Sequence, residues 1–199
     1  MNKMQVLSLY QDEVQTGVNV TAFMTGVTIF FTGLLITRYE SYDVSIKIPI
    51  LFLILSTFGF LYATLIYANA SGDLARLRTE RFHKEMNMGD SIGEYIGVYF
   101  LVLAIPLVIN VITSDIFLKA STLIVALGGL IIYHASGFSI MQNHFKKKHV
   151  FLLSIIVLLE IALYFTQKTT DIFVAIAMLL IFFLLTITYI SRNNRENTI

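Results

Sequence analysis

Six long apolar runs, almost free of charged side chains, divide the 199-residue chain. The runs lie near 18–37, 48–68, 92–113, 117–135, 149–166 and 172–190. A helix needs about 17–25 apolar residues to cross the hydrocarbon core of a bilayer, and these runs have that length. The sequence therefore predicts an all-α, polytopic integral membrane bundle of six transmembrane helices, with residues 1–199 as a single transmembrane domain in a cell membrane.

The composition restricts the class of protein in the same direction. Hydrophobic residues make up 56% of the chain and charged residues 14%, whereas soluble domains carry about 25% charged residues. An ordinary soluble domain, a disordered tail and a nucleic-acid binder are thereby excluded. The absence of Cys excludes disulfides and thiolate chemistry, and the four His lack the paired spacing of a metal site, so neither a metal nor a cofactor is predicted. No removable signal peptide is expected.

Lys and Arg are distributed unevenly between the two sides of the predicted bundle. The side that holds both termini and the linkers 69–91 and 138–148 carries ten of them, and the side with the three short loops carries four. Cytoplasmic segments carry the excess of these residues. We therefore expect three hairpins with both the N-terminus and the C-terminus inside.

The two basic linkers, 69–91 and 138–148, are expected to be cytoplasmic. The first is predicted to form a short separate helix, capped by Ser71 or Asp73 and stabilised by opposite charges four residues apart. Both linkers either set the orientation alone or also bind anionic lipid headgroups. With no Trp in the chain, Tyr67 and Tyr133 are expected in the interfacial aromatic belt.

The first run presents a polar stripe. At 100° per residue, four threonines fall on one side of a helix, beside Asn19 and two glycines. These threonines are Thr21, Thr25, Thr28 and Thr32. The stripe is either a packing face, because small and hydroxylated residues let helices approach closely, or the lining of a hydrated path in an oligomer.

The third run begins with three glycines four residues apart, Gly89, Gly93 and Gly97. This spacing predicts close contact with a neighbouring helix, and self-association through the first and third helices is expected. Ser91 and Glu94 have the spacing of a capping box, so we expect Glu94 to cap the start of this helix rather than to lie inside the membrane.

Glu160 lies inside the fifth run, where an ionisable group is costly and marks a site by default. It is expected to face the interior, with Tyr164 one turn away and Asn110 at a similar depth on another helix. Two interpretations remain open: a neutral, hydrogen-bonded group that holds helices together, or a site for an ion or a proton.

The segment from Ser71 to Arg76, followed by Asp90 and Glu94, resembles a degraded form of the CDP-alcohol phosphotransferase motif. That family places Asp-x-x-Asp-Gly-x-x-Ala-Arg after the second helix and Gly-x-x-x-Asp-x-x-x-Asp at the third. Here Ala68 and Ser71 replace two of its metal-binding acids, Met86 its glycine, and Glu94 its last Asp. The resemblance implies a lipid-headgroup transferase that works at the cytoplasmic side with Asp73, Arg76, Asp90 and Glu94.

Residues 22–27 are similar to the Phe-Ser-Asp-Gly segment of the prokaryotic relatives of lysosomal potassium channels, with Met24 and Thr25 at the Ser-Asp pair. The hypothesis we put first is a small channel- or transporter-like bundle that moves an ion or small solute. Its path would be formed by Thr21, Thr25, Thr28, Thr32, Asn19, Glu160 and Asn110. The alternatives are the headgroup enzyme and a non-catalytic membrane scaffold or assembly subunit.

Overall fold

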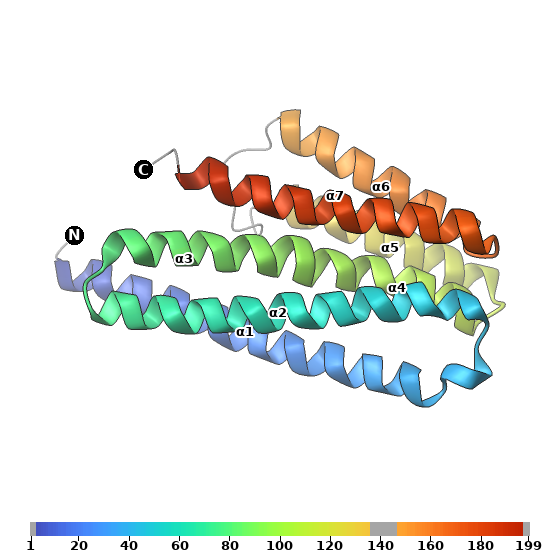
Figure 1. Cartoon of the computed structure of the whole chain (residues 1–199), viewed down its shortest axis with the longest axis horizontal. Helices are drawn as coiled ribbons and strands as arrows, with labels where there is room; N and C mark the ends of the chain where they lie inside the picture. Colours follow the sequence, from blue (N-terminus) through green and yellow to red (C-terminus); the bar gives the residue numbers. More distant parts are fainter. Residues whose placement is uncertain (1–2, 136–146, 197–199) are drawn as a thin grey trace.

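The computed structural model describes residues 3–135 and 147–196, and over these ranges the chain is helical, with no strand. The long helices are α1 (Lys3–Thr37), α2 (Lys47–Ala75), α3 (Thr79–Ile92), α4 (Tyr99–Ile112), α5 (Ile116–Ala135), α6 (Lys147–Thr166) and α7 (Thr170–Glu196). Two short 3₁₀ turns, η1 (Tyr39–Ser41) and η2 (Val44–Ile46), join α1 to α2, and a π-helical segment, η3 (Gly93–Val98), joins α3 to α4. The helices lie roughly side by side in one elongated bundle (Figure 1).

Five of the helices are long and apolar enough to cross a membrane: Leu7–Thr37, Val44–Ala75, Thr79–Ile112, Ile116–Tyr133 and Asp171–Ile190. A sixth apolar helix, Val150–Thr166, is shorter. The prediction of an all-helical chain with long apolar helices is therefore confirmed for the described residues. Most of the predicted linker 138–148 lies outside the described residues, together with the side chains of its Lys146, Lys147 and Lys148.

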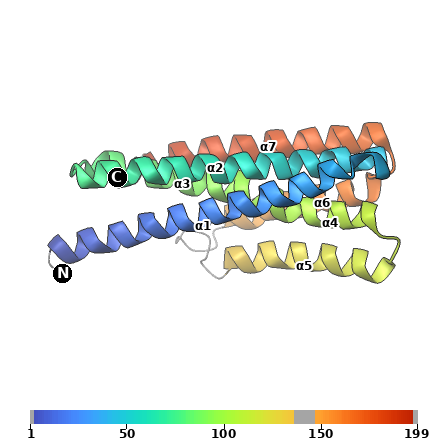
Figure 2. The ribbon, with the colours of Figure 1, turned by 90° about the horizontal axis from the view of Figure 1, so that it is seen from below.

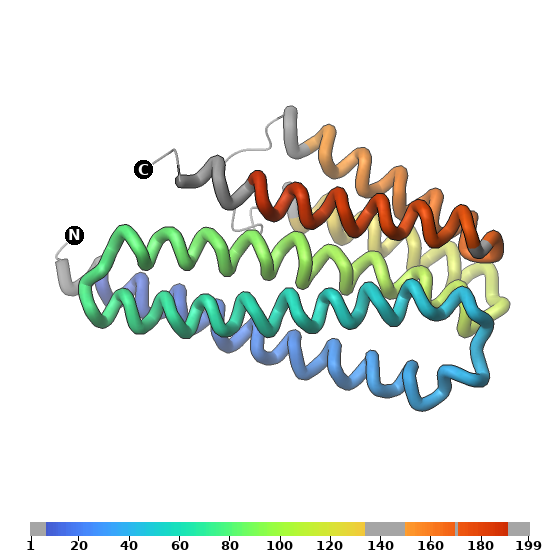
Figure 3. Tube along the Cα trace, viewed as in Figure 1, coloured from blue at the N-terminus to red at the C-terminus, as the bar shows by residue number. Residues whose placement is uncertain are grey.

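The first linker, 69–91, differs from the prediction of a separate helix. Helix α2 continues to Ala75, a three-residue turn follows, and a new helix begins at Thr79 and runs without a break through η3 into α4 (Figure 3). Ser71 and Asp73 lie within α2 and cap no helix start. The third apolar helix extends because no proline occurs between Thr79 and Pro106 and opposite charges support the exposed turns of α3.

The turn between α2 and α3 is a Schellman motif. The backbone N–H of Arg78 donates to the Asp73 carbonyl at 3.0 Å, and that of Leu77 donates to the Leu74 carbonyl at 3.0 Å. Leu77 adopts a positive φ of 59°, the left-handed conformation in which glycine is usual. We call this end of the bundle the turn end, and the opposite end, with residues 38–46, the loop end.

The buried side chains form two cores. The larger core joins α2, η3, α4, α6 and α7, and includes Phe52, Tyr99, Phe100, Leu103 and Phe173. The smaller core, with Val14, Tyr67, Leu74, Phe82 and Met86, joins α1, α2 and α3 at the turn end. Helix α1 has 35 residues and is about 52 Å long at 1.5 Å per residue, which exceeds the bilayer thickness. The smaller core packs against the part of α1 that lies towards the turn end.

The third apolar helix occupies the centre of the bundle. The glycines predicted to allow close helix contact do so: a Cβ on Gly97 would lie 2.7 Å from Phe60 Cδ1, and one on Gly89 would lie 2.8 Å from Tyr67 Cε1. Both contacts are with α2 of the same chain, while α7 covers another side. Helix α5 lies at the edge and packs chiefly on α4 (Figure 2).

Candidate functional site

The predicted polar stripe on α1 is a helix-packing face within the chain. Its four threonines are buried, and each hydroxyl donates to a carbonyl one turn earlier in α1, at 2.6–3.0 Å. Across the interface with α2, the Thr64 hydroxyl donates to Thr21 Oγ1 at 2.7 Å. Asn19 is exposed and accepts a hydrogen bond from Gln15 at 2.9 Å. The path through an oligomer stays a prediction.

A group of two carboxyls and four phenols lies towards the turn end, and all of its members except the half-buried Tyr133 are buried. We call it the Asp90 cluster, and it consists of Tyr67, Asp90, Glu94, Tyr95, Tyr99 and Tyr133. The Tyr67 hydroxyl donates to Asp90 Oδ1 at 2.7 Å, and Tyr133 on α5 lies within electrostatic range of Glu94 and Asp90. Glu94 is only 2% exposed. The cluster thus gathers ionisable groups from α2, α3, α4, α5 and η3.

The ring of Tyr67 is held between two glycines. A Cβ on Gly17 of α1 would lie 3.1 Å from the ring, and one on Gly89 of α3 would lie 2.8 Å from it. Since only glycine allows this approach from both sides, the phenol is aimed at Asp90 with little freedom to move. The expectation that Tyr67 lies in an interfacial belt is wrong, because its ring is 2% exposed.

The expected capping box at Ser91 and Glu94 is also wrong. The Ser91 hydroxyl donates to the Asn87 carbonyl at 2.9 Å, within a helix that continues past it. Glu94 instead lies in η3, where the Tyr99 N–H donates to the Glu94 carbonyl across a π-helical turn. Such widened turns are frequent at functional sites. Here the turn places Glu94 and Tyr95, adjacent in sequence, both in the interior.

Glu160 faces the interior, as predicted, in the part of α6 that packs against α4 and α7. Its side chain is 0% exposed, and among the described residues neither carboxyl oxygen has a hydrogen-bond partner. The expected polar neighbour Asn110 bonds elsewhere. Its Nδ2 donates to Gln167 Oε1 at 2.7 Å and to the Tyr164 carbonyl at 3.3 Å.

Gln167 was not expected from the sequence, because it lies at the end of an apolar run. It is 4% exposed and its Nε2 donates to the Leu107 carbonyl at 2.9 Å, so it ties the end of α6 to α4. The contact between Asn110 and Tyr164 sets the relative height of the two helices. The two helices run in the same direction. Glu160 precedes Tyr164 by four residues and Pro106 precedes Asn110 by four residues, so Glu160 lies level with Pro106.

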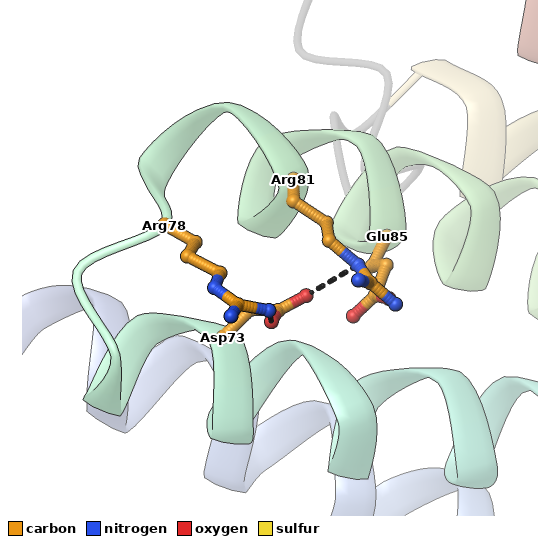
Figure 4. A network of polar contacts seen from close by, with 4 residues as sticks. All are labelled: Asp73, Arg78, Arg81 and Glu85. Atoms are coloured by element: carbon orange, nitrogen blue, oxygen red, sulfur yellow. Dashed lines mark hydrogen bonds and ion pairs between the residues drawn. The ribbon is translucent and has the colours of Figure 1, made fainter.

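The residues implied by the headgroup-transferase resemblance are not gathered in one place. Asp73 pairs with Arg81 Nε at 2.8 Å and with Arg78 Nη1 at 3.7 Å, and Arg81 also contacts Glu85 at 3.4 Å (Figure 4). Asp90 follows Arg81 by nine residues, about 13 Å along the helix. Arg76 is exposed and forms no ion pair within the described part of the chain.

In the ranges that the structure describes, no three acidic or His side chains are arranged to hold a metal ion. The architecture defines the chain as a multi-pass helical protein with long apolar helices. Comparisons with models of protein families, with curated proteins and with solved structures found no match.

Proposed function

We propose that the chain is a membrane transport protein that moves protons through its bundle, with both termini on the cytoplasmic side and Glu160 as the proton-carrying group. The observation that carries this proposal is the complete burial of the Glu160 carboxyl without a hydrogen-bond partner among the described residues. A carboxylate in such a place costs several kcal/mol unless a proton or a cation accompanies it. A group of this kind binds and releases a proton as its surroundings change.

Pro106 supports the same assignment. Proline has no N–H, so the carbonyl of Val102, four residues earlier in α4, lacks its usual helical donor. Glu160 lies level with this break in the hydrogen-bond ladder.

The Asp90 cluster supplies the second station. From Glu94 to the level of Glu160 is about 18 Å along the third helix, counted over twelve residues. Tyr99, which is fully buried, lies between the two levels. Chains of buried acids are typical of proton-moving membrane proteins. We assign the cluster to proton exchange with the turn end, which the excess of Lys and Arg predicts to be cytoplasmic.

Self-association remains part of the proposal with one change. The glycine face of the third helix is occupied by α2 of the same chain. Partner copies would therefore contact other surfaces, such as the side of α1 that exposes Phe23 and Phe30.

The test is proton flux into liposomes that contain the purified protein and a pH-sensitive dye, driven by a potassium diffusion potential. We expect the Glu160→Gln variant to lose about tenfold or more of the protein-dependent flux, since the amide fills the same space and carries no proton. Glu80→Gln, which changes an exposed acid in the first turn of α3, is the matched control and should keep the parental rate. Equal flux in the Glu160→Gln protein and its parent, or no flux in the parent, would contradict the proposal.

A further inference from the structure

An apolar groove opens at the loop end between α1, α2 and α4. Its volume is about 530 Å³, and its walls include Phe31 and Leu34 of α1, Leu53 of α2, and Ile105 and Ile112 of α4. Phe31, Ile105 and Ile112 are each between 43% and 51% exposed, so the groove is open along its side. In a bundle that crosses a membrane, such an opening faces the hydrocarbon chains and admits a ligand from the bilayer.

The length of the groove corresponds to one leaflet. The α4 residues that line it extend from Leu101 to Ile112, which is about 16 Å at 1.5 Å per residue. Half of a hydrocarbon core of about 30 Å is close to this value. An acyl chain from the leaflet at the loop end therefore fits the groove along its whole length.

The loop end of the groove is basic. Arg38 lines both the groove and an adjoining open cavity of about 860 Å³, which Lys47 and Glu40 also line. Neither Arg38 nor Lys47 forms an ion pair with any described residue. With Glu40 included, the three charged side chains of the cavity leave one net positive charge beside the apolar groove.

We propose that this site binds one anionic phospholipid from the leaflet at the loop end. One acyl chain lies in the groove, and the phosphate lies at Arg38, whose guanidinium matches phosphate oxygens, with Lys47 adding a second cation. An anionic phospholipid carries an anionic headgroup and an unbranched acyl chain in one molecule. It therefore matches both the positive charge of the cavity and the apolar groove beside it. The site is separate from Glu160 and does not depend on proton transport.

The experiment is native mass spectrometry of the detergent-purified chain, titrated with phosphatidylglycerol or with phosphatidylcholine of the same acyl chains. We expect one phosphatidylglycerol to bind in preference to phosphatidylcholine. Each cation near a membrane surface is worth about fivefold in affinity for an anionic lipid. The double variant Arg38→Gln, Lys47→Gln should therefore lose this preference, whereas Arg76→Gln, which removes an exposed cation at the turn end, should keep it.

A second variant separates the groove from the general lipid surface. Ile105→Trp fills the groove and should reduce binding of both lipids at this site, with helix content by circular dichroism as the check on folding. Equal binding of the two lipids by the parent, an unchanged preference in the double variant, or unchanged binding by a folded Ile105→Trp protein would each overturn the proposal. Competition by soluble glycerol phosphate at the same concentration as the lipid would also overturn the proposal, because the acyl chain would then contribute nothing to the binding of the lipid.

Discussion

Two of the three buried acids on which the proposed function depends, Asp90 and Glu160, differ in their partners. Asp90 accepts a hydrogen bond from the Tyr67 hydroxyl at 2.7 Å, whereas Glu160 has no such donor among the described residues. A carboxyl with a fixed donor is held in one place. A carboxyl without one responds to any nearby change in structure or hydration, and this is the property that a proton carrier needs.

Replacing Tyr67 with Phe tests the first of these contacts. The variant removes a donor to a buried carboxyl and should lower the free energy of unfolding by about 1.5–3 kcal/mol. Tyr62→Phe removes a hydroxyl from an exposed position of the same helix and should change little. Unfolding by a denaturing detergent, followed by circular dichroism, measures both. Equal losses in the two variants would contradict the role assigned to the hydroxyl.

Residue by residue, the sequence predicted the inward orientation of Glu160 but not the burial of Tyr67 and Glu94. The inward orientation of Glu160 was predictable because a lone acid in an apolar run cannot face lipid. The absence of a polar partner for Glu160 was not predictable. Asn110 donates hydrogen bonds to Gln167 and Tyr164 instead, and both lie more than fifty residues away from it in the sequence. Ser91 and Glu94 show the opposite failure: a local capping pattern had no helix start to cap, because the helix had already begun at Thr79.

Among the helices, α2 and the third apolar helix approach each other closely at Gly59. A Cβ on Gly59 would lie 2.6 Å from the backbone nitrogen of Gly97 and 2.8 Å from the backbone carbon of Ile96. Backbone atoms cannot move aside as a flexible side chain does. The whole helix pair must separate to accept a methyl group there, and the π-helical segment with Glu94 and Tyr95 lies in the part that would shift.

We therefore expect Gly59→Ala to destabilise the protein by about 1–3 kcal/mol, as overpacked sites do. The same substitution at Gly26, where nothing lies within 4 Å, should be neutral or slightly stabilising. Thermal unfolding in detergent compares the two variants. A Gly59→Ala protein as stable as Gly26→Ala would show that the two helices are further apart than described.

The glycine spacing predicted this contact from the sequence, but nothing in the sequence indicated which helix would fill it. The partner is α2 of the same chain rather than another copy. The π-helical segment carried no sequence signal at all. In the structure, its Gly97 carbonyl accepts a hydrogen bond from the Ser56 hydroxyl of α2 at 2.7 Å.

At the scale of the whole molecule, the long apolar runs determined the class of architecture, because helices of this length and composition have few other environments. The lengths of the helices were less predictable. Helices α1, α2 and α3 extend beyond the apolar runs at the turn end, where a second small core supports them. Packing of amphipathic helix faces stabilises helical turns outside the apolar runs. Hydropathy alone therefore predicts helices that are too short.

The arrangement of the chain across the bilayer is the claim on which the proton and lipid proposals both depend. Because the chain has no Cys, single cysteines can be introduced without background labelling. Suitable exposed positions are Arg76 in the turn between α2 and α3, and Glu40, Ser114 and Lys168 in the three loops at the other end. A membrane-impermeant maleimide applied to sealed, oriented vesicles reports on which side each cysteine lies.

The account predicts that Arg76→Cys is labelled only from the cytoplasmic side, and that Glu40→Cys, Ser114→Cys and Lys168→Cys are labelled only from the opposite side. Labelling of Arg76→Cys and Glu40→Cys from the same side would contradict it.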